Sequence, residues 1–85
     1  MRKSLFSKSY AFLLAELRRA RKRARLTQGQ LAERIGATQS FVSKCERGER
    51  RLDILEFRAW CRALNISFVA FTAKLDRAVG KGDGS

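Results

Sequence analysis

Hydrophobic residues recur at intervals of three and four along most of the chain, which is the spacing of amphipathic α-helices. The first stripe, between about residue 7 or 9 and residue 25, consists of Tyr10, Leu13, Leu14, Leu17, Ala20 and Ala24. Four more stripes follow it, and the sequence contains no proline to interrupt them. This pattern predicts an all-α protein with five helices.

Residues typical of helix ends separate the second stripe from the third. Thr27 and Gln30 have the spacing of a capping box, in which each side chain accepts the backbone N–H of the other residue. Gly36 can adopt the positive φ angle that often ends a helix, and Thr38 can cap the next helix. Because only Ala37 lies between them, the second and third helices are expected to meet at a very tight turn.

Similar signals bound the last two helices. Gly48 is expected to end the third helix and Asp53 to cap the fourth. Asn65 should end the fourth helix, and Ser67 should cap the fifth. The residues expected to face the core from the fourth helix are Ile54, Phe57, Trp60, Cys61 and Leu64.

The length of 85 residues suits one compact domain and is too short for two. We expect an N-terminal arm at residues 1–8, a folded domain at 9–79 and a disordered tail at 80–85. The tail has no bulky apolar residue with which to join a core.

The segment between Thr38 and Gly48 has two distinct faces. Val42 and Cys45 form its apolar face. The opposite face, roughly 140–200° away at about 100° per residue, carries Ser40, Lys44 and Arg47. Such a helix is expected to pack by one face and to leave the other available for binding.

Two charged residues fall on faces that should be buried. Arg21 lies inside the apolar stripe of the first helix, and Glu46 lies beside Val42 on the third helix. A buried arginine without a carboxylate partner is energetically expensive. We therefore predict an ion pair between Arg21 and Glu46 that ties the two helices together.

The chain is strongly basic, with 19 Lys and Arg against 8 Asp and Glu, for a formal charge of +11. A chain of this charge binds polyanions non-specifically at low salt. Charge alone does not separate DNA from RNA or from anionic lipid.

Several other classes of function have no support in the sequence. There is no histidine, no arrangement of a nucleophile with a base and no phosphate-binding glycine loop, so we expect no enzyme and no cofactor. Cys45 and Cys61 form no CxxC pair and are expected to be buried thiols rather than metal ligands or a disulfide. No apolar run is long enough to cross a bilayer and none resembles a cleaved leader. Binding to a membrane surface is disfavoured because the apolar stripes are needed for the core.

The residues around the tight turn match a known pattern. Counted from Gln28, Ala32 is the fifth residue, Gly36 the ninth and Val42 the fifteenth. Further matching residues are Leu26, Thr27, Leu31, Ser43, Glu46, Gly48, Ala63 and Leu64. Over residues 17–71 the chain resembles the phage-repressor type of helix-turn-helix regulators, also called the XRE or Cro-like family. The resemblance implies a compact five-helix bundle of the lambda-repressor-like type, with its helix-turn-helix at the second and third helices.

The same resemblance implies that the third helix lies in the major groove of duplex DNA, where each base pair presents a distinct pattern of donors and acceptors. The residues then expected to contact bases are Gln39, Ser40, Ser43 and Lys44. Those expected to contact the DNA backbone are Thr27, Gln28, Thr38, Arg47, Arg50 and Arg51. Backbone contacts position the protein, whereas base contacts specify the sequence.

The fifth helix is more apolar than closing a small bundle requires. Phe71 is expected to complete the core. A possible dimer interface consists of Phe68, Val69, Thr72 and Leu75. Since members of the resembled family usually bind as homodimers, a two-fold interface here would place two third helices on a palindromic operator.

These observations favour a sequence-specific transcriptional regulator of bacterial or phage origin, most simply a repressor, that acts in the cytoplasm and is associated with the nucleoid. One alternative is the antitoxin of a toxin–antitoxin pair, which regulates its own operon and also binds a toxin or another regulatory protein. The other is a packaging protein that binds nucleic acid through charge alone. Only the regulator should retain a large preference for one sequence as the salt concentration rises.

Overall fold

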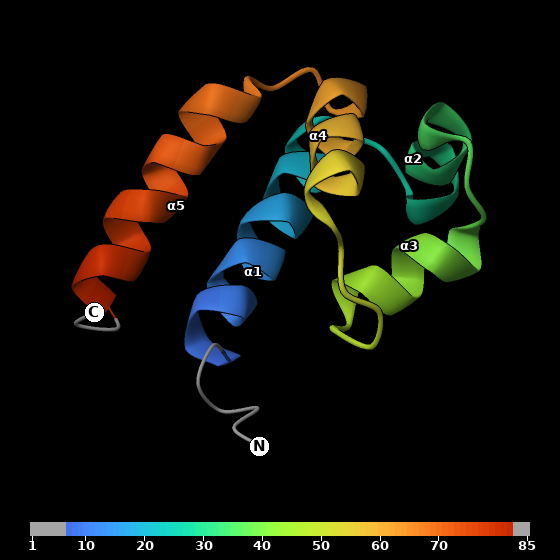
Figure 1. The fold of residues 1–85 in the computed structure, drawn as a ribbon. Coiled ribbons are helices and arrows are strands. Elements are labelled where there is room, and N and C mark those ends of the chain that lie inside the picture. Colours follow the sequence, from blue (N-terminus) through green and yellow to red (C-terminus); the bar gives the residue numbers. More distant parts are fainter. Residues whose placement is uncertain (1–6, 83–85) are drawn as a thin grey trace.

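The computed structural model describes residues 7–82, and all the regular secondary structure in this range is helical (Figure 1). They are α1 (Ser7–Arg23), α2 (Gln28–Ile35), α3 (Gln39–Glu46), α4 (Ile54–Ala63) and α5 (Phe68–Gly82). The prediction of an all-α chain with five helices is confirmed. No described helix is both long and apolar enough to span a bilayer.

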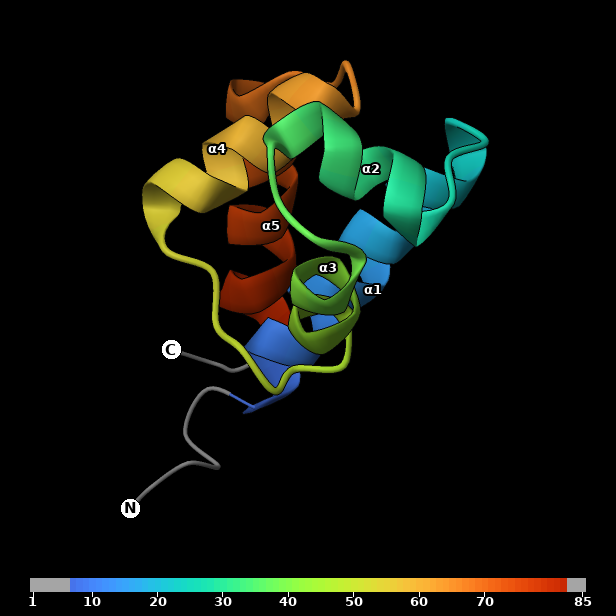
Figure 2. The same ribbon diagram turned by 90° about the vertical axis from the view of Figure 1, so that its right-hand side faces the viewer.

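Helix α1 lies at the centre of the arrangement. It contacts α5 on one side and α3 on the other, and α2 packs on both α3 and α4. Figure 1 shows α1 and α5 side by side with opposite chain directions. Figure 2 shows α3 almost along its axis, in front of α1, with α2 crossing above it. The short α3 thus packs on the longer α1, and α2 is held in place by α3 and α4.

The core is formed by the apolar stripes of the first four helices. The buried hydrophobic residues that form one cluster are Leu17, Ala20, Leu31, Ala32, Val42, Cys45, Phe57, Trp60, Cys61 and Leu64. Each large side chain in it contributes about 1.5–3 kcal/mol by leaving water. Phe68 and Phe71 of α5 pack edge-on against Phe57, with ring centroids 5.2 Å and 5.4 Å away. Phe71 therefore completes the core, as the sequence predicted.

The helix boundaries follow from local hydrogen bonds. The Thr27 hydroxyl oxygen accepts the N–H of Gln30 at 3.0 Å, and the Gln30 side chain accepts the N–H of Thr27 at 2.9 Å. The Thr38 hydroxyl accepts the N–H of Phe41 at 3.1 Å. Gly36 ends α2 with a φ of 72°. The predicted capping box and tight turn are both present.

Two expectations about single apolar residues are wrong. Ile54 was expected in the core but is 63% exposed. It is the first residue of α4, where the chain has only just left the cap at Asp53 and has not yet reached the core. Ala24 is also exposed, since it follows the last residue of α1 in a turn where Arg25 has a φ of 62°.

The helical ends differ from the expected domain limits. Helix α1 begins at Ser7, two residues before the expected start of the domain, and α5 continues to Gly82, three residues beyond its expected end. Val79, the last residue of the expected domain, lines a shallow apolar groove, shared with α1, that is described below. Residues 1–6 of the expected arm and 83–85 of the expected tail lie outside the described residues.

Candidate nucleic-acid interface

Helix α3 presents one buried and one exposed face. Val42 and Cys45 are 0% exposed and belong to the core cluster. Ser40, Lys44 and Arg47 are all exposed on the opposite side. Within residues 7–82, no part of the chain covers these three side chains, so this face can meet a macromolecule.

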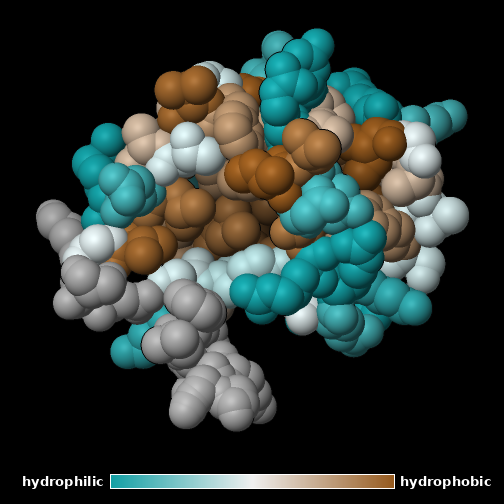
Figure 3. Space-filling model, viewed as in Figure 1, coloured by the Kyte–Doolittle hydropathy of each residue, from teal (hydrophilic) through white to brown (hydrophobic). Residues whose placement is uncertain are grey.

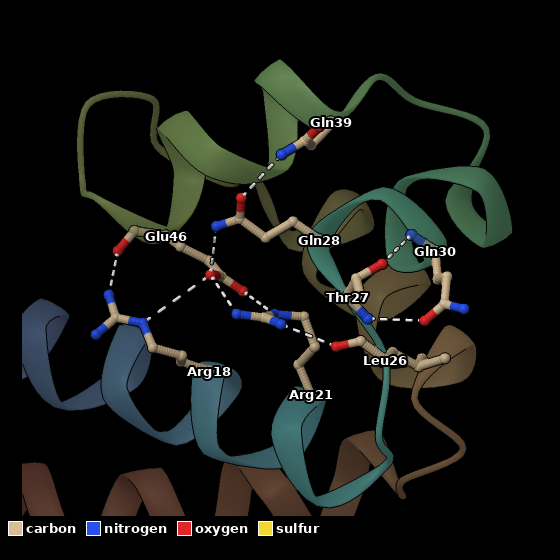
Figure 4. Close-up of polar contacts among 8 residues, drawn as sticks. All are labelled: Arg18, Arg21, Leu26, Thr27, Gln28, Gln30, Gln39 and Glu46. Atoms are coloured by element: carbon tan, nitrogen blue, oxygen red, sulfur yellow. Dashed lines mark hydrogen bonds and ion pairs between the residues drawn. The ribbon is translucent and has the colours of Figure 1, made fainter.

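A buried ion pair fixes the C-terminal end of α3. Arg21 Nε donates to Glu46 Oε2 at 2.7 Å, and Arg21 Nη2 donates to Glu46 Oε1 at 3.0 Å (Figure 4). The two side chains are 10% and 3% exposed. Arg21 Nη1 also donates to the carbonyl of Leu26 at 2.8 Å, which holds the turn before α2. The structure thus contains the pair expected from the two stripes.

The network around Glu46 is larger than the sequence indicated. Arg18 Nη2 donates to the Glu46 carbonyl oxygen at 2.9 Å, and Gln28 Nε2 donates to Glu46 Oε1 at 3.0 Å. Gln39 Nε2 in turn donates to Gln28 Oε1 at 3.5 Å (Figure 4). The network therefore joins α1, the start of α2 and both ends of α3, and it orients the two helices relative to each other.

The protonation state of Glu46 follows from opposing effects. Burial acts to raise the pKa of its carboxyl group. Hydrogen bonds from Arg21 and Gln28, together with the positive charges of Arg21 and Arg18, outweigh burial and leave the pKa below the usual 4.5. Glu46 is therefore a carboxylate at neutral pH, as the ion pair requires.

The N-terminal ends of α2 and α3 lie next to each other, because Gln28 and Gln39 are the first residues of these helices and are in contact. Helix N-termini carry partial positive charge and free N–H groups, which favours an anion such as phosphate. The exposed hydroxyl groups of Thr27 and Thr38 use their oxygens as caps and keep their protons available to donate. This end of the motif suits a nucleic-acid backbone.

The arginines after α3 are held by neighbouring groups of the chain. Arg47 forms a two-point pair with Glu49, at 2.9 Å and 3.2 Å, and also donates to the Ser43 hydroxyl. Arg50 forms a two-point pair with Glu56, at 2.9 Å and 2.8 Å. Neither pair was among the contacts expected from the sequence.

Aromatic rings hold the same loop. The guanidinium of Arg50 lies 5.0 Å from the centroid of the Phe41 ring, and that of Arg51 lies 4.2 Å from the centroid of the Tyr10 ring. Such cation–π contacts favour a fixed side chain. Among the described residues, Lys44 on the exposed face of α3 is in no ion pair.

The residues expected at a dimer interface do not share one environment. Phe68 packs against Phe57 and is half-buried, whereas Val69 is 75% exposed. The hydroxyl of Thr72 donates to the Val69 carbonyl at 3.0 Å within α5. Leu75 lines the shallow apolar groove between α1 and α5, whose other lining residues are Ser9, Tyr10, Leu13, Arg51 and Val79. Figure 3 shows apolar side chains gathered along the seam between these two helices.

A second buried carboxylate was missed altogether. Glu16 accepts a hydrogen bond from Lys74 of α5 at 2.8 Å and one from Arg19 at 2.6 Å. The bond from Lys74 lowers the pKa of Glu16, which burial acts to raise. This pair attaches α5 to α1. Its signal in the sequence was Glu16 standing next to Leu17 in an otherwise basic helix.

The comparison with known families agrees with this geometry. The sequence profile of the helix-turn-helix family matches residues 17–71, which include the whole of α2, the turn and α3. The chain belongs to the XRE-type helix-turn-helix family. It is accordingly a DNA-binding transcription regulator.

Solved structures extend the match beyond the motif. This XRE-type regulator is 44% identical to an XRE-family-like protein from Pseudomonas syringae pv. tomato, with a TM-score of 0.84 over 88% of this chain and 92% of that one. It is 28% identical to a mutant of the restriction–modification controller protein C.Esp1396I, with a TM-score of 0.71 over 98% of this chain and 100% of that one. A search of curated proteins gave no match.

Proposed function

We propose that this regulator recognises a specific duplex sequence by placing α3 in the major groove. Gln39, Ser40, Ser43 and Lys44 are the residues that contact base edges. An amide side chain can pair with adenine, and a lysine can donate to guanine O6 and N7. Gln39, Ser40 and Lys44 are exposed. Ser43 is half-buried, and its hydroxyl accepts a hydrogen bond from Arg47.

The observation that carries this proposal is the anchoring of α3. Its apolar side is completely buried, and Glu46 at its end is held by Arg21 and Gln28 from two other helices. A helix fixed in this way presents its outer residues at set positions, which direct reading of bases requires. The adjacent N-termini of α2 and α3 supply the phosphate contacts through Thr27, Gln28 and Thr38.

The arginines beside α3 complete the backbone contacts in this proposal. Arg47 and Arg51 bind phosphates next to the groove. In this proposal Arg50 also contacts the backbone, from a position that Glu56 and Phe41 fix.

Selection of bound duplexes from a random pool tests the function. We expect a defined site to emerge, and Lys44→Ala should lose preference at one position of it, by about 1–3 kcal/mol. Arg51→Ala should weaken the selected duplex and a scrambled one to a similar degree. Selection that yields no common sequence would instead favour a packaging protein that binds through charge.

We further propose that the regulator acts as a repressor and binds as a homodimer through α5. The apolar seam between α1 and α5 and the exposed Val69 support a surface for a second copy. Two α3 helices about 34 Å apart would then read a palindromic site on one side of the DNA. A palindrome among the selected duplexes supports the dimer, and a single half-site opposes it. A duplex target implies action in the cytoplasm, on the nucleoid.

A second candidate role is the control of a restriction–modification system. The likeness to the controller protein spans nearly the whole of both chains, and it favours this role. Mapping the selected sites onto the genome tests it. Sites next to restriction and modification genes would support the role, and sites only elsewhere would exclude it.

A further inference from the structure

Two arginines beside α3 are already paired with carboxylates of this chain. The pair of Arg47 with Glu49 and that of Arg50 with Glu56 each consist of two hydrogen bonds. A guanidinium binds a carboxylate and a phosphate with the same parallel two-point geometry. A DNA phosphate approaching either arginine therefore meets a site that a glutamate occupies.

The two glutamates differ in how firmly they are held. Glu56 Oε1 also accepts the N–H of Asp53 at 2.9 Å, in the capping box of α4, and its side chain is 28% exposed. Glu49 stands in the loop after α3 and its side chain is 55% exposed. Among the described residues its carboxylate has only Arg47 as a hydrogen-bond partner. The Glu49 pair is thus the one that a phosphate can replace without disturbing a helix end.

We propose that Glu49 is an internal substitute for a DNA phosphate, which holds Arg47 in the free protein and weakens the binding of every duplex sequence. On binding DNA, Arg47 exchanges the Glu49 carboxylate for a phosphate oxygen. Glu49 thereby sets the protein concentration at which the DNA site is occupied. This inference rests on the proposed binding of duplex DNA by α3.

The effect should not depend on sequence. Phosphates are the same at every position of a duplex, so a group that competes with them changes all affinities alike. The contact of Arg47 with Ser43 uses Nη1, whereas the pair with Glu49 uses Nε and Nη2. Loss of the pair therefore leaves the contact with a proposed base-reading residue in place.

Glu49→Gln tests the proposal, because it removes the charge and keeps the shape. The matched control is Glu33→Gln, which makes the same change of charge at an exposed residue of α2 that has no side-chain partner among the described residues. Each protein is titrated, over a series of salt concentrations, into a labelled duplex from the selection and into a scrambled duplex of equal base composition. Circular dichroism melting confirms that each variant is folded.

We expect Glu49→Gln to bind both duplexes about two- to five-fold more tightly at low salt, with a steeper dependence on salt by up to about one ion. Glu33→Gln should have a smaller effect. In an Arg47→Ala background the gain from Glu49→Gln should largely disappear, because the pair is then already absent.

Three patterns of gain would overturn the proposal. These are equal gains from the two glutamate variants, a full gain in the Arg47→Ala background, and a gain confined to one of the two duplexes. Duplex binding by the unaltered protein without the expected gain refutes this inference alone. Absence of any duplex binding by the unaltered protein refutes the proposed function and this inference with it.

Discussion

At the scale of single residues, Glu46 has the largest structural role in the motif. Its carboxylate accepts hydrogen bonds from α1 and α2, and its backbone carbonyl accepts one from Arg18. The bonds from Arg18 and Arg21 join α3 to α1, which is far away in the sequence, and the bond from Gln28 joins the end of α3 to the start of α2. The short α3 has only one buried face, so this polar network adds an orientation that apolar packing alone does not define.

Glu46→Ala should lower the free energy of unfolding by about 3–5 kcal/mol, because it leaves Arg21 buried without its partner. Chemical denaturation of the two proteins measures the difference. Glu33→Ala, at an exposed position of α2, is the control and should change stability by less than about 0.5 kcal/mol. Similar small losses for both variants would show that the Arg21 pair contributes little.

The same carboxylate makes stability depend on pH. Burial raises the pKa of Glu46, but the hydrogen bonds from Arg21 and Gln28 lower it more, so its folded pKa lies below the unfolded value near 4.5. A group shifted in this direction stabilises the fold fully above 4.5, and the contribution is lost as the pH falls through the folded pKa.

Denaturation at a series of acidic pH values should therefore show stability falling below about pH 4.5. Glu46→Gln should remove part of this fall. The remainder should come from the other carboxylates whose pKa is lowered. These are Glu16, lowered by Lys74 and Arg19, and Glu49 and Glu56, lowered by Arg47 and Arg50. An unchanged pH dependence in Glu46→Gln would mean that the pKa of Glu46 is the same in the folded and unfolded protein.

Ion pairs of single residues could be predicted only where helix periodicity alone places the side chain on a known face. Arg21 and Glu46 each interrupt an apolar stripe, so their faces and their need for a partner could be read from the sequence. The pairs made by Arg47 and Arg50 depend on the path of the loop between α3 and α4 and on side-chain rotamers, which no periodicity specifies. Glu56 was partly readable, since it stands three residues after Asp53 in the spacing of a capping box.

At the scale of elements, the turn between α2 and α3 determines how the motif presents its outer face. Caps at Thr27 and Thr38 fix where the two helices begin, and Gly36 reverses the backbone between them. These signals are local hydrogen bonds and φ preferences, and for that reason the sequence predicted them well. Ile54 was misjudged because its period fits the core stripe of α4, while its place at the helix start directs it to solvent.

Gly36→Ala should destabilise the protein by about 1 kcal/mol, because a Cβ is unfavourable at a φ of 72°. A Cβ there would meet no heavy atom within 4 Å, so backbone strain is the whole cause. Gly29→Ala is the matched control inside α2, where the nearest atom would be Thr27 Oγ1 at 3.9 Å. It should instead stabilise by about 0.4–1 kcal/mol. Thermal melting of both variants measures the difference, and the same sign for both would contradict this view of the turn.

At the scale of the whole molecule, the five stripes and the motif residues were enough to predict the fold and the family. The position of α5 was less certain, because its apolar residues fit both a core and an interface. The structure divides them: Phe68 and Phe71 meet Phe57, while Val69 faces away from the core. Lys74 adds an ion pair to Glu16 that fixes α5 on α1. Helix α5 is therefore part of the folded monomer, and its exposed Val69 can still contact a partner.

Val69→Glu tests whether Val69 lies in the interface of the proposed dimer. Because Val69 is 75% exposed, a charge there should leave the monomer folded but should be strongly unfavourable in an apolar interface. Sedimentation at micromolar concentration should show dimers of the unaltered protein and monomers of the variant. The variant should also lose affinity for a palindromic duplex and bind a single half-site about as well as before, since α3 lies on a different part of the molecule. If the variant dimerises normally, the interface does not include Val69. If the unaltered protein is monomeric with and without DNA, the proposed dimer is wrong.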